Sequence, residues 1–325
     1  MRPISEVSLA GHRPPPSPPP PESPQSLPPP QSPHSPPSPH SPPSPASPPS
    51  PPKAVTDVRA IAVRPGRYLE LPERLATEEP LEVRAAGPGQ DSVPVAVTMR
   101  TPGHDFELAA GFVVTEGLVR PDEIAAVSYC DAVDLDEGRY NAVTVSLIRP
   151  WDHDVARRSF LTTSSCGVCG KASIDQVELS CPVVPPGPPV VASRISAMPD
   201  QLRRAQRVFD QTGGLHAAGL FASDGTLLAH REDVGRHNAV DKVVGDGVLR
   251  RRHPPPAAVL MVSGRVSFEI TQKAAMAGIG VIAAVSAPSS LAVSAAHRLG
   301  VSVAGFVRGD KFNVYSHPER IVLDR

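Results

Sequence analysis

The chain lacks several features that would place it in a familiar class of protein. It has four cysteines in 325 residues, a net charge of −1, and aromatic residues make up only 4% of it. So few cysteines argue against a disulfide framework, and a near-neutral charge gives no bulk attraction to nucleic acids or membranes. No run of about 18 apolar residues occurs, so we expect no transmembrane helix. With no signal-peptide core after Met1, we expect a cytoplasmic enzyme or enzyme helper.

The segment from Arg13 to Pro52 contains little besides proline and serine. More than half of the 42 prolines lie there. Proline has no backbone N–H, and the segment offers few apolar side chains to offset the entropy lost on ordering. We therefore expect residues 1–53 to be a disordered tail that favours polyproline II, with an SH3-type ligand as the alternative.

The pattern after the tail predicts two structured parts. Residues 54–155 are expected to form a small α+β domain with one helix over Asp105–Thr115, capped by Asp105. Residues 156–190 are expected to be a flexible cysteine loop and linker. In residues 191–325 helices alternate with buried strands, which favours a mostly parallel sheet covered by helices. The first helix there is predicted over 199–209, opened by Pro199.

Three loops of unusual polarity follow predicted strands. They are Ser263-Gly264-Arg265, Ser286–Ser290 and Arg308–Lys311. Ligands of open α/β sheets bind at the carboxyl ends of the strands, where helix N-termini and arginines can hold phosphate. Each cation alone is better explained as a solvated surface charge, but three such loops together predict a pocket for a phosphate-rich ligand.

The run Glu232–Lys242 packs acids, bases and an imidazole at one helix start. Asp233 is expected to cap the helix, and Asp241 and Lys242 to face solvent. Arg236-His237-Asn238 has no such structural explanation, so we favour a site role for it. His216, beside a glycine pair, is a weaker candidate because a lone histidine is more often a packing residue.

The most informative stretch is Cys166-Gly-Val-Cys169-Gly-Lys171, which follows four hydroxyl residues. Two thiols at this spacing can hold a metal, form a reversible disulfide or carry sulfur as a nucleophile. Zinc is disfavoured because Cys130 and Cys181 are isolated and a structural site needs four ligands. A thioredoxin-like pair is disfavoured because no thioredoxin unit surrounds it. Lys171 and loop N–H groups would lower the thiol pKa.

Five separated stretches together carry a resemblance to a known family. They are Thr163–Lys171, Thr212–Ala218, Glu232–Lys242, Ser263–Ser267 and Phe306–Tyr315. With them the chain resembles the formate dehydrogenase accessory sulfurtransferases (FdhD), from about Val58 to the C-terminus. The resemblance implies a cytidine-deaminase-like α/β/α sandwich without zinc ligands, next to the smaller α+β domain, and a homodimer.

The resemblance also implies an activity. Family members accept persulfide sulfur from a cysteine desulfurase and transfer it to the molybdenum cofactor, in its bis-molybdopterin guanine dinucleotide form, which formate dehydrogenase requires. On this chain Cys166 would carry the persulfide and Cys169 would be a second thiol. The protein would bind this cofactor as a substrate and hold no other group tightly. The residues that would contact the cofactor are Phe306, Val307, Arg308, Gly309, Asp310 and Lys311.

The residue-level interpretation extends this predicted binding site. It adds Ser263, Gly264, Arg265 and His237 as cofactor-binding residues, and GDP as an analogue of the ligand. The alternative function is a non-catalytic chaperone that binds the molybdenum cofactor without using its cysteines.

Overall fold

The protein is described from a computed structural model, which covers residues 52–130, 140–152, 181–252 and 258–324. These residues belong to one compact unit, Pro48–Arg325. Cys166, Cys169 and Lys171 lie outside the described residues, and so does almost all of the predicted tail.

The N-terminal part is built on a four-stranded sheet covered by one helix. The strands run in the order β4-β3-β6-β5, and only β3 and β6 are parallel. Their bounds are Glu79–Ala86 for β3, Val93–Arg100 for β4, Ile124–Tyr129 for β5 and Ala142–Leu147 for β6. On β3 the fully buried Leu81, Val83 and Ala85 alternate with half-buried residues, so one face carries the core. That face packs on α1 (Asp105–Thr115).

The C-terminal part contains a six-stranded sheet in the order β13-β12-β11-β10-β8-β9. Its strands are β8 (His216–Phe221), β9 (Leu227–Asp233), β10 (Val259–Val262), β11 (Val281–Ala284), β12 (Ser302–Arg308) and β13 (Lys311–Ser316). Only β10–β11 and β11–β12 are parallel pairs. The prediction of a mostly parallel sheet was therefore wrong, because the hairpins β8–β9 and β12–β13 add antiparallel strands at both edges.

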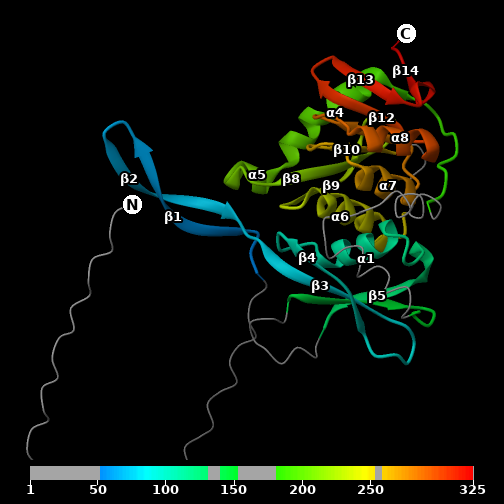
Figure 1. Ribbon diagram of the computed structural model, residues 1–325, viewed down its shortest axis with the longest axis horizontal. Helices are drawn as coiled ribbons and strands as arrows, with labels where there is room; N and C mark the ends of the chain where they lie inside the picture. The colour runs from blue at the N-terminus through cyan, green and yellow to red at the C-terminus, as the bar shows by residue number, and fades with distance from the viewer. Residues whose placement is uncertain (1–51, 131–139, 153–180, 253–257, 325) are drawn as a thin grey trace, which may run out of the picture. The chain divides into compact units, whose positions relative to one another are not determined.

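Helices cover both faces of this sheet, which confirms the predicted α/β/α class (Figure 1). Residues of β10 alternate between the faces: Leu260 and Val262 join the core shared with three helices, while Val259 and Met261 join the core shared with α4. The three helices are α6 (Arg236–Leu249), α7 (Phe268–Met276) and α8 (Ser290–Leu299), and α4 spans Ala192–Ala205. No helix in the described part of the chain is long and apolar enough to cross a membrane.

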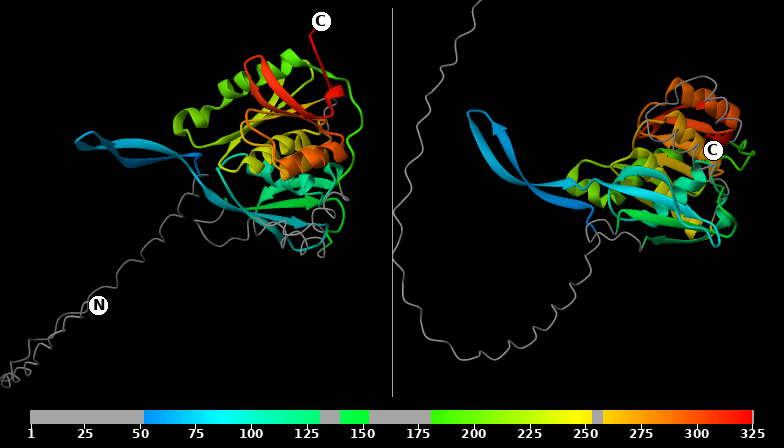
Figure 2. Two further views of the ribbon diagram at one scale, coloured as in Figure 1. Left: turned by 45° about the horizontal axis from the view of Figure 1, so that its top comes forward. Right: turned by 60° about the horizontal axis from the view of Figure 1, so that its bottom comes forward.

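A single apolar core joins the two parts. It extends from Leu81 and Val83 of β3 through Ala110 of α1 and Val240 of α6 to Leu260 of β10. Helices α1 and α6 thus lie between the two sheets, as Figures 1 and 2 show from three directions. The predicted boundary between the parts stays a prediction, but no gap in the core separates them.

Two glycines let α1 and α6 approach at backbone distance. A β carbon on Gly111 of α1 would clash with the backbone carbonyl oxygen of Asp241 in α6. The contact is reciprocal, because a β carbon on Gly245 of α6 would clash with the carbonyl oxygen of Glu107 in α1. Any larger residue at either position would force the helices apart.

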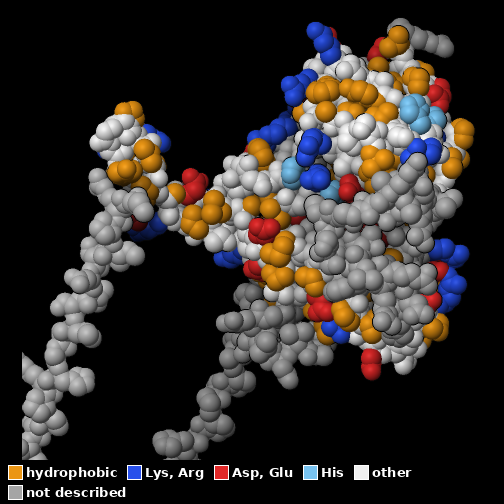
Figure 3. All heavy atoms as spheres, viewed as in Figure 1, with side chains coloured by type: hydrophobic (Ala, Val, Ile, Leu, Met, Phe, Trp, Pro, Cys, Tyr) orange, Lys and Arg blue, Asp and Glu red, His pale blue; other side chains and the backbone are white. Residues whose placement is uncertain are grey.

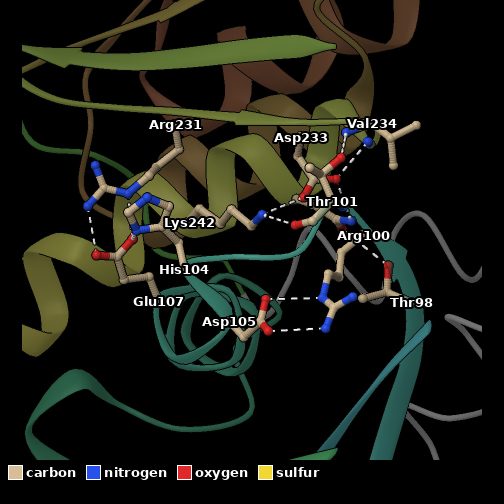
Figure 4. Close-up of polar contacts among 12 residues, drawn as sticks. Thr98, Arg100, Thr101, His104, Asp105, Glu107, Arg231, Asp233, Val234 and Lys242 are labelled. Carbon is tan, nitrogen blue, oxygen red and sulfur yellow. Dashed lines mark hydrogen bonds and ion pairs between the residues drawn. The ribbon is translucent and has the colours of Figure 1, made fainter. Parts of the chain in front are cut away.

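Buried charges surround this crossing (Figure 4). Lys242 Nζ lies 2.7 Å from Asp233 Oδ2 and donates a 2.8 Å hydrogen bond to the carbonyl of Thr101. Asp241 accepts from Thr115 Oγ1 at 2.6 Å and from Lys273 Nζ at 3.0 Å. The prediction that Asp241 and Lys242 face solvent was wrong: both are 1% exposed, because their partners on α1, α7 and β9 replace water.

One predicted helix cap and one predicted helix start were also wrong. The N-cap of α1 is His104, and Asp105 is its first helical residue, whose carboxylate accepts two hydrogen bonds from the Arg100 guanidinium at 3.1 Å. Pro199 lies inside α4, which begins seven residues earlier at Ala192 and is followed by α5 (Arg207–Thr212). Burial of Ile195, Met198 and Leu202 on one face outweighs the proline start signal.

The first two strands form a sheet of their own. β1 (Val55–Arg64) and β2 (Arg67–Ala76) pair with each other in an antiparallel hairpin and with no other strand of the described part. Ile61, Val63 and Tyr68 on this hairpin are 70%, 68% and 77% exposed. Its contacts with the remainder include α5. Short pairs complete the described chain, namely β7 (Val190–Val191) with β14 (Ile321–Val322).

We predict that Gly111→Ala and Gly245→Ala each lower the free energy of unfolding by about 3 kcal/mol, since overpacking at a backbone contact outweighs the better helix propensity of alanine. Urea unfolding followed by circular dichroism measures this. Gly247→Ala, on α6 like Gly245, is the matched control, because its β carbon would meet no atom within 4 Å. Equal stability of the Gly111 and Gly247 variants would contradict the crossing geometry.

Candidate functional site

The carboxyl ends of three neighbouring strands border one large cavity. Ser263 follows β10, Val285 follows β11, and Val307 and Arg308 end β12. The cavity has a volume of about 750 Å³, within the usual range for small-molecule sites. Its opposite wall comes from α4, α5 and the segment after them, through the residues Pro199, Asp200, Leu202, Arg203, Gln206, Phe209, Gly213, Gly214, Leu215 and His216. Figure 3 shows basic side chains gathered near α4 and the adjoining end of the sheet.

The segment predicted as the third loop is in fact a tight hairpin. Arg308 ends β12 and pairs with Lys311, the first residue of β13, so only Gly309 and Asp310 form the turn. Gly309 has a φ of 56°, which glycine adopts without strain. Of the residues predicted here, Val307, Arg308 and Gly309 line the cavity, whereas Asp310 and Lys311 do not.

Phe306 marks an irregularity in β12 just before this turn. It has a φ of 56°, and the register of the β12–β13 pair shifts between Gly305 and Arg308. Its backbone N–H donates to the carbonyl of Ser286, which ties the strand end to the loop after β11. The ring is 42% exposed and does not line the cavity. The bulge therefore sets the direction in which Arg308 leaves the strand.

His216 lies in the wall of the large cavity, although the sequence favoured it only weakly. Burial, and then the positive charge of Arg236, lowers the pKa of its imidazole. Its neighbour Ala217 donates a backbone hydrogen bond of 2.9 Å to Ser263 Oγ, so the two strand ends are fixed to each other. Arg203 of α4 and Gln206, which joins α4 to α5, were missed altogether, because neither carries a motif.

A second, smaller cavity of about 280 Å³ lies on the other side of Gly264. A β carbon on Gly264 would be 3.4 Å from His216 Nδ1, in the large cavity, and 4.0 Å from Arg236 Cδ, in the small one. The small cavity is lined by Arg236, Arg265, Val266, Ser267, Ala287, Pro288 and Ser289. The predicted binding residues therefore divide between two compartments, with Ser263 in one and Arg265 in the other.

His237 lies beside the smaller cavity. Its Nε2 is 3.3 Å from Ser267 Oγ and 3.9 Å from a Glu269 carboxylate oxygen. Burial, followed by the charges of Arg236 and Lys273, lowers its pKa to about 4. The imidazole is thus neutral at pH 7. In the unfolded chain this histidine would have a pKa near 6.5, so below that pH the unfolded state binds a proton that the folded state does not. The free energy of unfolding therefore decreases as the pH falls below 6.5.

Asn238 holds the start of α6 in place through its side chain. Its Nδ2 donates to the carbonyl of Met99 at 2.7 Å and to Asp233 Oδ1 at 3.1 Å. Asp233 does not cap α6 directly; the N-cap is Gly235, whose N–H donates to Asp233 Oδ1 at 2.8 Å. These bonds fix the start of α6, whose first turn carries Arg236 in the lining of the smaller cavity and His237 beside it.

We predict that the NMR titration midpoint of the His237 imidazole is near pH 4 and that Arg236→Gln raises it, since a neighbouring positive charge is removed. Arg308→Gln, in the other cavity, is the control and should leave the midpoint unchanged. A midpoint near the ordinary value of 6.5 in the unsubstituted protein would contradict the described environment.

Comparisons with known proteins point to one family. The model of the FdhD/NarQ family matches residues 76–322, a range that includes Cys166 and Cys169. A sulfur carrier protein FdhD from Mycobacterium tuberculosis is 55% identical over 260 residues, which cover 77% of this chain and 92% of that protein. The sulfur carrier protein FdhD from Streptomyces coelicolor is 49% identical over 273 residues, which cover 82% of this chain and 95% of that protein.

A solved structure agrees with these matches. A protein from Desulfotalea psychrophila, proposed to be a formate dehydrogenase accessory protein, superimposes with a TM-score of 0.64 at 25% identity. The match covers 83% of this chain and all of the other. The resemblance that five sequence motifs indicated is confirmed, and the chain belongs to the FdhD/NarQ family.

Proposed function

We propose that the protein is a sulfur carrier that serves formate dehydrogenase. In this proposal it accepts persulfide sulfur from a cysteine desulfurase and transfers it to the molybdenum cofactor, the bis-molybdopterin guanine dinucleotide, as a sulfurtransferase. The observation that carries the proposal is the 55% identity, over most of the chain, to a protein named as a sulfur carrier.

Cys166 is the sulfur-accepting residue of the proposal. Its thiolate would attack the terminal sulfur of the desulfurase persulfide, forming a new S–S bond while the desulfurase cysteine leaves as a thiolate. The persulfide on Cys166 then holds the sulfur for the cofactor. The step needs a thiolate, and an ordinary cysteine with a pKa of about 8.5 is mostly protonated at neutral pH. Lys171 is proposed to favour the charged form.

The large cavity is proposed to hold a guanine nucleotide end of the cofactor. Its volume of about 750 Å³ suits such a ligand, and Arg308 and Arg203 line it. In the described part of the chain Arg308 makes no ion pair, whereas Arg203 is 2.6 Å from Asp210. A guanidinium at the end of a strand, with no carboxylate partner, is suited to a phosphate.

The first test of the proposal is Cys166→Ala, which we expect to abolish maturation of formate dehydrogenase while the fold stays intact. Incubation with a desulfurase and cysteine should add the mass of one sulfur atom to the Cys166 peptide of the unsubstituted protein. Cys130→Ala is the matched control and should mature the enzyme normally. Normal maturation by the Cys166 variant would instead favour a cofactor chaperone whose cysteines are dispensable.

The second test addresses the cavity. Arg308→Ala should weaken binding of GDP about tenfold or more, the usual cost of losing a charge-assisted hydrogen bond. Isothermal titration calorimetry measures this. Arg204→Ala, on the neighbouring helix but outside the cavity lining, is the control. Equal GDP affinity in the two variants would remove the cavity from the proposal.

A further inference from the structure

The smaller cavity has its own chemistry, distinct from that of the large one. It lies where α7 and α8 begin, since their N-cap residues Ser267 and Ser289 both line it. Backbone N–H groups at helix N-termini lack partners within the helix, and the helix dipoles place partial positive charge there. Val266 and Pro288, which form an isolated parallel bridge, hold the two helix starts side by side.

Two arginines that form no ion pair with any described residue line this cavity. The Nε of Arg236 is buried and has no hydrogen-bond partner. Within the described ranges, neither Arg236 nor Arg265 takes part in an ion pair. The buried Arg100, by contrast, is fully engaged: it donates to Asp105 and Glu79, and its Nη2 also donates to the carbonyl of Tyr140.

An unpartnered guanidinium nitrogen away from water costs free energy, so its retention calls for an anionic partner. None of the residues that line the small cavity is acidic. Glu269, outside the lining, lies 3.9 Å from His237 Nε2; burial raises its pKa, but hydrogen bonds from Ser267 and its own backbone, with the charges of His237 and Arg236, lower it overall. The neutral His237 imidazole adds a polar group without adding charge. The lining is therefore cationic and is not neutralised from within.

We propose that the small cavity is a binding site for a single phosphate group, held by Arg236 and Arg265 at the starts of α7 and α8. A guanidinium pair matches the oxygens of a tetrahedral oxyanion, and helix N-termini are frequent phosphate sites. The phosphate has two possible sources: inorganic phosphate, or one phosphoryl group of a nucleotide whose base occupies the large cavity across Gly264. Only the second source rests on the proposed function.

Calorimetric titration of the full chain with inorganic phosphate tests the site. We expect saturable binding that Arg265→Gln and Arg236→Gln each weaken about tenfold, the cost of one charge-assisted contact. Arg308→Gln, in the large cavity, should leave phosphate binding unchanged. Arg265 is exposed, so its substitution leaves the core intact. Absence of saturable phosphate binding, or binding that depends on Arg308 and not on Arg265, would overturn the proposal.

A competition experiment distinguishes the two sources. If a nucleotide phosphoryl group occupies the site, saturating inorganic phosphate and Arg265→Gln both weaken GDP binding. If the site takes inorganic phosphate, the two ligands bind independently and Arg265→Gln leaves the GDP affinity unchanged. Cys166→Ala should bind phosphate like the unsubstituted protein, so failure of sulfur transfer and failure of this site give different results.

Discussion

The close crossing of α1 and α6 is the contact on which the remaining structure depends. Because Gly111 and Gly245 each face a backbone carbonyl of the other helix, two sheets from distant parts of the chain share one core. The same approach brings α1 within reach of charges on α6 and α7, and the Asp241–Lys273 pair stays buried because Thr115 completes it. On the other side, Lys242 and Asp233 fix the start of α6. The first turn of that helix carries Arg236, which lines the smaller cavity, so the position of this side chain depends on the crossing.

The sequence predicted the elements whose signals are local. The bounds of α1 agree with the prediction, because hydrophobic spacing and the flanking turn residues act over short distances. Features that depend on distant partners were missed. Asp241 and Lys242 looked like surface charges because their partners lie far away in the sequence, and Pro199 looked like a helix start because burial of the preceding residues is not visible locally.

The candidate site was likewise predictable only where the signal was local. The rule that ligands meet the carboxyl ends of strands placed Ser263 and Arg308 near each other, and both do line the large cavity. The rule could not show that Gly264 separates two compartments, since that depends on where His216 and Arg236 point across the loop. Nor could it find Arg203 and Gln206, which reach the cavity only through the path of α4 and α5. The cysteines were identified by spacing alone, and they lie outside the described residues.

The β1–β2 hairpin has a consequence for how this chain can change over time. It pairs with neither of the larger sheets, and the range matched by the family model begins at its last residue, Ala76. None of its residues belongs to the buried core of the described chain, so substitutions there leave that core intact. Its water-exposed Ile61, Val63 and Tyr68 can therefore be exchanged for polar residues with little loss of stability, which would change the solubility of the protein and what this edge adheres to.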